Sequence, residues 1–252
     1  MPTIPLSTVG LEYGYLPQQG LFPPLDLRCR AGEVTAILGT NGRGKTTLLH
    51  TLIGHLPPIA GTLHCTDPVG FVPQIFTPPF AYSVLDMVLM GRAARIRLFA
   101  LPSAHDVAVA RDALAQLGIT DLADRDFNAL SGGQRQLVLI ARALASECRM
   151  LILDEPTAAL DWQNQAHVLR LLQRLARTTD LSILLTTHDP AHALAIADRA
   201  LLLMADRQFL YGSCDETITE ENLSRLYGLP VREVSVEGYR TLVPLLNKEE
   251  AL

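Results

Sequence analysis

The sequence predicts an α/β domain with a largely parallel sheet, because short apolar runs alternate with segments of helical spacing. Three of these runs are typical of buried strands: EVTAILG (33–39), RMLILDEP (149–156) and LSILLTTHD (181–189). A helical pattern follows each of them. The chain has 252 residues, of which 48% are apolar and 19% charged, so it is long enough for one sizeable domain with a well-buried core.

The first helix is predicted within KTTLLHTLIGHL (45–56), where leucine and isoleucine recur at helical spacing. GTLHCTDPVGFVPQ (61–74) contains short β-like pieces. From Ser83 to about Ala145 the pattern becomes helical. We interpret this stretch as an insertion into the α/β domain.

The second half continues the alternation, with a helix over roughly 161–177, a short helix in AHALAIAD (191–198) and a hairpin in RALLLMADRQFLYG (199–212). Near the C-terminus, Thr217 and Glu220 have the spacing of a capping box. They are predicted to open the short helix EENLSRLYG (220–228), after which the chain ends in a polar tail.

The net charge of −5 argues against a general nucleic-acid binder, which usually carries a basic surplus. The cysteines are far apart and lack metal-ligand spacing, as is typical of incidental thiols in a reducing compartment: Cys29, Cys65, Cys148 and Cys214. We find no signal-peptide pattern and no apolar run near the ~18–20 residues that span a bilayer. We therefore expect a soluble chain, which can still serve a membrane-embedded partner.

GTNGRGKT (39–46) matches the phosphate-binding pattern G-x-x-x-x-G-K-[ST]. Glycines let backbone N–H groups curl around a phosphate, lysine supplies positive charge for the β- and γ-phosphates, and the hydroxyl serves Mg²⁺. The strand before it and the helix after it are the required context, so we predict a P-loop that binds a Mg-nucleoside triphosphate. The predicted nucleotide-binding residues here are Gly39, Asn41, Gly42, Gly44, Lys45, Thr46 and Thr47.

Two adjacent carboxylates, Asp154 and Glu155, end the apolar strand LILDEP. In a P-loop enzyme the first is expected on the Mg²⁺ side of the site. The second would point the other way and could polarise a water that attacks the γ-phosphate.

LSGGQRQLVLIARAL (130–144) places a serine and two glycines directly before a long apolar, helix-like run. Backbone N–H groups at a helix N-terminus favour phosphate, so the chain would carry a second phosphate-binding element. An apolar stripe is expected to bury this helix: Leu137, Ile140, Ala141 and Leu144.

Together these motifs resemble the ATP-binding cassette (ABC) family over essentially the whole chain. LSGGQ (130–134) matches the family's signature motif letter for letter, and His188 matches its switch histidine. Gln74 matches the Q-loop glutamine, and Asp161 closes a D-loop-like TAALD. The resemblance implies one ABC ATPase domain over 1–252: a P-loop NTPase core with an antiparallel β subdomain (1–82 and 146–215), a helical signature subdomain (83–145) and a short C-terminal extension (216–252).

The resemblance also implies roles for individual residues. The catalytic set would be Glu155, His188, Lys45 and Gln74, and the Mg²⁺ set would be Thr46, Gln74 and Asp154. ATP and Mg²⁺ are the implied cofactors. The base would stack on an aromatic upstream of the P-loop, for which Tyr15 is the first candidate and Tyr13 the competitor. Arg43 either touches phosphate or is merely exposed.

The resemblance further implies a head-to-tail homodimer, in which the signature of one chain closes over the P-loop of the other. The trans element would comprise Ser131, Gly132, Gly133 and Gln134. With one cassette and no membrane segment, the transport pathway is expected in separate permease subunits. A soluble substrate-binding protein would be an indirect partner, nucleic acid would not be one, and the chain would sit peripherally on the cytoplasmic face of the inner (plasma) membrane.

A groove near Gln74 and residues 76–92 would receive a short permease helix, unless its apolar residues simply pack the helical subdomain: Phe76, Pro78, Phe80, Tyr82 and Val84. Within the family, SVLDMVLMGR (83–92) resembles ATPases of importers for iron-siderophores, haem, cobalamin or molybdate and tungstate. Residues 77–106 look most like the molybdate/tungstate branch. The alternatives are an exporter ATPase, a non-transport ABC ATPase that acts on nucleic acid, and a relative that binds ATP without hydrolysing it.

Overall fold

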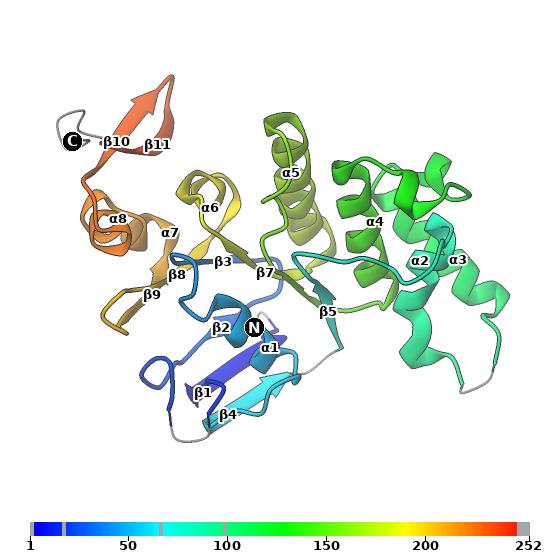
Figure 1. The fold of residues 1–252 in the computed structure, drawn as a ribbon, viewed down its shortest axis with the longest axis horizontal. Coiled ribbons are helices and arrows are strands. Elements are labelled where there is room, and N and C mark those ends of the chain that lie inside the picture. The colour runs from blue at the N-terminus through cyan, green and yellow to red at the C-terminus, as the bar shows by residue number, and fades with distance from the viewer. Residues whose placement is uncertain (1–2, 17–18, 66–67, 98–99, 246–252) are drawn as a thin grey trace.

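Six strands form the central sheet, in the order β5–β6–β7–β3–β8–β9 (Figure 1). The structure is a computed structural model that describes residues 3–16, 19–65, 68–97 and 100–245. The strands are β3 (Val34–Leu38), β5 (Val69–Val72), β6 (Met150–Leu153), β7 (Ser182–Thr187), β8 (Arg199–Leu203) and β9 (Phe209–Ser213). All neighbours are parallel except β8 and β9, so the predicted largely parallel sheet and the predicted 199–212 hairpin are confirmed.

Both faces of this sheet are buried, because successive side chains of a strand point to opposite faces. In β3, Ala36 and Leu38 belong to one apolar cluster and Ile37 belongs to the other. The first cluster is covered by the helices α4 (Gly132–Ala145), α5 (Trp162–Thr179) and α6 (Pro190–Ile196). Helix α1 (Lys45–Leu52) contributes to the second cluster. A sheet that is buried on both faces requires strands without polar alternation, which explains the near-continuous apolar runs of β3, β6 and β7 in the sequence.

A second, antiparallel sheet completes the layer around α1. It consists of β1 (Leu6–Glu12), β2 (Arg28–Cys29) and β4 (Ala60–Cys65), in the order β2–β1–β4. Its buried side chains, such as Leu6 and Leu11, pack in the same cluster as α1. Strand β1 escaped sequence analysis because its pairing with β4 shifts register between Val9 and Glu12, which breaks the simple alternation.

The stretch predicted as helical contains α2 (Val84–Leu89), α3 (Ala104–Gln116) and α4, with 3₁₀ turns η1 (Met90–Arg95), η2 (Thr120–Leu122) and η3 (Phe127–Ala129). The three α-helices each begin with a serine capping box, at Ser83, Ser103 and Ser131. Arg92 is 3% exposed and ties the segment together. It donates to Asp106 Oδ1 at 3.1 Å and to the carbonyl of Ala145, which ends α4, at 2.9 Å.

The C-terminal elements are α7 (Cys214–Thr217), α8 (Glu220–Tyr227) and a hairpin of β10 (Val231–Val236) with β11 (Tyr239–Pro244). The predicted capping box was wrong: Thr217 ends α7, and Thr219 is the N-cap of α8, accepting from Asn222 N. The hairpin was not predicted, because only Val231 and Leu242 of its apolar residues are buried. It lies at the end of the molecule near α6 (Figure 1).

Among the described residues, no helix is both long and apolar enough to cross a membrane.

Candidate active site

The loop between β3 and α1 wraps the N-terminus of α1. Gly44, its last residue, has a left-handed backbone (φ +81°), and a Cβ there would lie 2.7 Å from Leu21 Cδ1. Only glycine fits both conditions without strain. This residue therefore allows the loop to curl and lets α1 begin at Lys45.

Lys45 is buried, with 6% of its surface exposed. Its Nζ donates to the carbonyl of Gly39 at 2.7 Å and lies 3.5 Å from Glu155 Oε1. A buried ammonium requires partners that offset its desolvation. The carbonyl of Gly39 and the carboxylate of Glu155 are these partners, and they hold the ammonium group of Lys45 beside the loop.

The next residue connects the loop to the acid pair. Thr46 Oγ1 donates to Asp154 Oδ2 at 2.8 Å, and Thr186 Oγ1 donates to Asp154 Oδ1 at 2.6 Å. Thr186 Oγ1 also accepts from Glu155 N at 2.8 Å. Thr186 therefore fixes both residues of the acid pair, a contribution that sequence analysis missed because Thr186 looks like any residue at the end of a buried strand.

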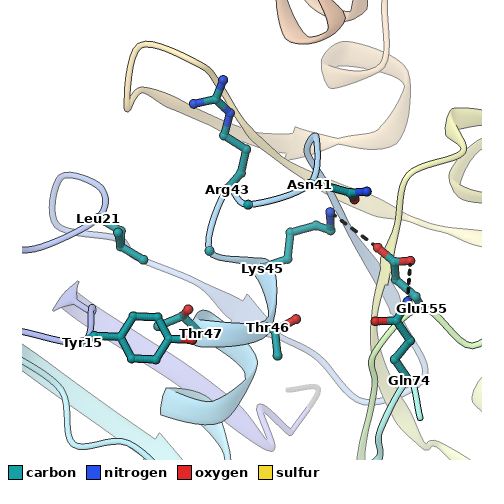
Figure 2. A pocket seen from close by; sticks show the side chains of 11 residues that line it. Tyr15, Leu21, Asn41, Arg43, Lys45, Thr46, Thr47, Gln74 and Glu155 are labelled. Atoms are coloured by element: carbon teal, nitrogen blue, oxygen red, sulfur yellow. Dashed lines mark hydrogen bonds and ion pairs between the residues drawn. The ribbon is translucent and has the colours of Figure 1, made fainter.

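Glu155 has a left-handed backbone (φ +46°), which is uncommon outside glycine. Its side chain points away from Asp154 and toward Lys45 of the P-loop. This agrees with the expectation that the two carboxylates point in different directions. Besides Lys45, Gln74 Nε2 donates to Glu155 Oε2 at 3.2 Å and His188 Nδ1 lies 3.5 Å from the same oxygen. Three predicted catalytic side chains, Lys45, Gln74 and His188, thus converge on Glu155, and Figure 2 shows the contacts of the first two.

A pocket of about 420 Å³ opens over the loop. Figure 2 shows Lys45, Thr46, Glu155 and Gln74 on one side of it and Tyr15 on the other. The remaining lining residues are Leu21, Asn41, Gly42, Arg43, Gly44 and Thr47. Sequence analysis missed Leu21, which lies in a segment without a clear pattern.

The two candidate tyrosines occupy different environments. Tyr15 is 72% exposed and lines the pocket. Tyr13 is fully buried and stacks on Phe22 with ring centroids 6.1 Å apart. Tyr15 is therefore exposed at the pocket, and Tyr13 is a core residue.

Arg43 extends away from Lys45 (Figure 2). Its Nε donates to Thr40 Oγ1 at 3.2 Å and its Nη1 donates to the carbonyl of Ala205 at 3.3 Å. These bonds brace the loop against the turn after β8, so Arg43 has a structural task in this conformation.

The signature residues do not line this pocket. Ser131 is the N-cap of α4: its Oγ accepts from Gln134 N at 3.3 Å, and Gln134 Oε1 accepts from Ser131 N at 3.1 Å. Gly133 packs so closely on α5 that a Cβ would lie 2.6 Å from Asn164 Oδ1. Asp161 caps α5 by accepting from Asn164 N at 2.8 Å. Ser131 and Gly132 are thus exposed beside Ala159 and Leu160, and they do not line the pocket over the P-loop of the same chain.

Comparison with known proteins identifies this arrangement. Residues 22–158 match the family model described as ABC transporter. The chain belongs to the ABC transporter family. It is an ATP-binding protein of that family and an ATPase.

Relatives of this ABC ATPase include the molybdate import ATP-binding protein of Haemophilus influenzae, 49% identical over 90% of both chains. The hemin import ATP-binding protein of Thermobifida fusca is 38% identical over 88% of this chain and 81% of its own. A solved structure described as an inward-facing, metal-chelate type ABC transporter is 45% identical, covers 99% of this chain and 100% of its own, and superposes with a TM-score of 0.92.

The geometry of the pocket fits ATP with a divalent cation. The P-loop N–H groups and Lys45 offer donors and positive charge where phosphates would lie. Thr46 Oγ1 and Asp154 Oδ2, 2.8 Å apart, are a hydroxyl and a carboxylate, which are the hard oxygen ligands that Mg²⁺ prefers.

The segment expected to form the permease groove is only partly available. Pro78 and Val84 are buried, and Phe76 packs under Arg142, whose guanidinium carbon lies 4.3 Å from the ring centroid. Phe80 is 68% exposed. Tyr82 borders an apolar pocket of about 560 Å³ next to α2 and η1. The available apolar surface therefore lies further along the chain than expected.

Proposed function

We propose that this chain is the ATPase subunit of an importer for molybdate or a related oxyanion or metal chelate. The observation that carries the proposal is the 49% identity to a molybdate import ATP-binding protein over 90% of both chains. The 38% identity to a hemin import ATP-binding protein supports iron chelates as the second cargo class.

In the proposed reaction, Glu155 polarises the water that attacks the γ-phosphate, and His188 and Gln74 orient that carboxylate. Their contacts of 3.5 Å and 3.2 Å with Glu155 Oε2 support these roles. Lys45 would neutralise phosphate charge, and Thr46, Gln74 and Asp154 would hold Mg²⁺. The bound cation would neutralise charge that develops on the phosphates.

We further propose that the active unit is a head-to-tail homodimer of the single ABC domain, with the helical segment 83–145 acting as a signature subdomain. The position of Ser131–Gln134 outside the pocket supports this, because a second phosphate-binding element is useful there only to another chain. Binding that differs between ATP and ADP would then shift the pair between closed and open forms.

The membrane pathway is proposed to lie in separate permease subunits, supplied with cargo by a soluble substrate-binding protein. The chain would lie peripherally on the cytoplasmic face of the inner membrane. The apolar pocket beside α2 and η1, bordered by Tyr82, Leu89 and Met90, is the proposed seat of a permease helix. Because this pocket lies on the helical segment, a rotation of that segment would move a permease helix bound there.

The test is transport by the intact complex. The chain is purified from its native membrane with its permease, reconstituted in liposomes with ATP inside, and supplied with the co-isolated binding protein. We expect uptake of ⁹⁹Mo-molybdate that stops in a Lys45→Ala complex. Uptake of ferric chelate but not molybdate would replace the cargo assignment, and ATP-driven movement in the opposite direction would contradict import.

A further inference from the structure

The connection between β7 and α6 consists of His188 and Asp189. The imidazole of His188 is 58% exposed and reaches Glu155 Oε2 at 3.5 Å. An exposed ring at the end of such a contact is not held by packing. Its position therefore depends on how the backbone of this short connection is fixed.

On one side the connection is fixed locally. Asp189 N donates to Thr187 Oγ1 at 3.1 Å, and Asp189 Oδ1 accepts from Ala191 N at 2.8 Å. These bonds orient Asp189 as the N-cap of α6. They do not involve the carbonyl of His188 itself.

That carbonyl is bound from the C-terminal extension. Tyr227, the last residue of α8, donates its hydroxyl to the carbonyl oxygen of His188 at 2.8 Å across 39 positions of sequence. Burial raises the pKa of the Tyr227 hydroxyl far above its ordinary value, so it stays protonated and able to donate.

The donor is placed rigidly. Leu223 and Leu226 of α8 are 0% and 3% exposed, and Gly228 ends the helix directly after Tyr227 with a left-handed backbone. A pocket of about 360 Å³ lies beside this bond and is lined by the His188–Pro190 segment, by Leu223 and Tyr227 of α8, and by the hairpin residues Val231 and Leu242. The hydrogen bond is thus a discrete attachment next to a cavity.

We infer that Tyr227 is a positioning residue of the ATPase site, whose hydroxyl holds the His188 carbonyl and so sets where the imidazole meets Glu155. The inference rests on the proposed role of His188 in hydrolysis. It gives the C-terminal extension a link to ATP turnover, although none of its residues described by the structure, which end at position 245, lines the nucleotide pocket itself.

The decisive variant is Tyr227→Phe, which removes one oxygen atom and keeps the ring. Losing one such hydrogen bond corresponds to about a 3- to 10-fold change. We expect a loss of that size in kcat for ATP, with KM unchanged and with a drop in unfolding temperature no larger than that of Tyr211→Phe. Tyr211→Phe is the control, because Tyr211 on β9 also donates to a backbone carbonyl, that of Arg28, at 2.8 Å, and its hydroxyl additionally accepts from Arg199 Nε at 2.9 Å. A wild-type kcat in Tyr227→Phe, or an equal loss in Tyr211→Phe, would overturn the inference.

A double-mutant cycle with His188→Ala shows through which residue Tyr227 acts. We expect Tyr227→Phe to have no further effect on the residual single-turnover rate of His188→Ala. If it lowers that rate by the same factor as in wild type, Tyr227 acts elsewhere and the inference is wrong. If His188→Ala alone hydrolyses ATP at the wild-type rate, the proposed role of His188 fails, and the inference fails with it.

Discussion

Lys45 Nζ lies 3.5 Å from Glu155 Oε1, and both side chains are almost completely buried (Figure 2). The carboxylate of Glu155 is thus paired with the ammonium group that would otherwise pair with the γ-phosphate of ATP. In the proposed reaction, ATP would compete with Glu155 for Lys45, and this exchange would release Glu155 to polarise a water. One ion pair therefore links nucleotide binding to the proposed base.

Glu155→Gln is expected to separate these two effects. Loss of the base should lower kcat by about 10²- to 10⁴-fold, while loss of the competing charge should tighten ATP binding by about 2- to 5-fold. Steady-state phosphate release and equilibrium binding of ATP measure the two quantities. Glu221→Gln, on the exposed face of α8, serves as the control. Weaker ATP binding in Glu155→Gln would show that the ion pair does not compete with nucleotide.

Ser131→Arg should abolish turnover and leave ATP binding intact, because Ser131 lies outside the pocket of its own chain. Loss of the N-cap costs about 1 kcal/mol of stability, which Ser131→Ala measures separately. A mixture of Ser131→Arg and Lys45→Ala chains contains heterodimers with one complete composite site. We expect about a quarter of the wild-type activity from the mixture. No recovery at all would argue for sites built within single chains.

Trp162 is the single tryptophan of the chain, is 86% exposed and directly follows Asp161. In the proposed dimer this position lies at the interface, so closure should bury it. In Glu155→Gln, ATP with Mg²⁺ should shift the emission maximum to shorter wavelength in proportion to the dimer seen by size-exclusion chromatography. An unchanged spectrum in a sample that has dimerised would place Trp162 outside the interface.

Tyr15 and Tyr13 should respond differently to substitution. Tyr15→Ala is expected to weaken ATP binding about 10-fold, the effect of losing one base–aromatic stack, and Tyr15→Phe should retain affinity. The hydroxyl of Tyr13 is buried without a hydrogen-bond partner among the described residues. Tyr13→Phe should therefore raise the free energy of unfolding by about 1 kcal/mol and leave ATP binding unchanged. Calorimetric titration and urea unfolding distinguish the two.

Asp106 should make stability depend on pH in the acid range. Hydrogen bonds from Ser103, together with Arg92, lower the pKa of this carboxyl from 3.8 to about 2 in the folded protein. The stabilisation is therefore complete above the unfolded pKa and is lost as pH falls through the folded one. We expect Asp106→Asn to lower the unfolding temperature at pH 6 by about 3 °C and to flatten its decline between pH 4 and pH 2. Asp112→Asn, an exposed change on the same helix, should do neither.

Much of the site could be predicted because its chemistry needs adjacent residues. The P-loop, the acid pair and LSGGQ are each contiguous, and each follows or precedes an element with a strong apolar pattern. Thr186, Leu21 and Tyr227 could not be predicted, since their partners lie far away in sequence. Strand β1 and the C-terminal hairpin escaped because neither presents a regular alternation of buried and exposed residues.

By itself, the sequence determined the α/β class, the phosphate-binding loop and the family, because apolar periodicity and short contiguous motifs are local properties. Only the tertiary structure placed Tyr15 at the pocket and Tyr13 in the core, gave Arg43 a bracing task, and brought Lys45, Gln74 and His188 onto Glu155. It also attached the carbonyl of His188 to Tyr227. In each case the sequence offers chemically equivalent groups. Burial and distance distinguish them, and both arise only when strands that are distant in sequence pack side by side.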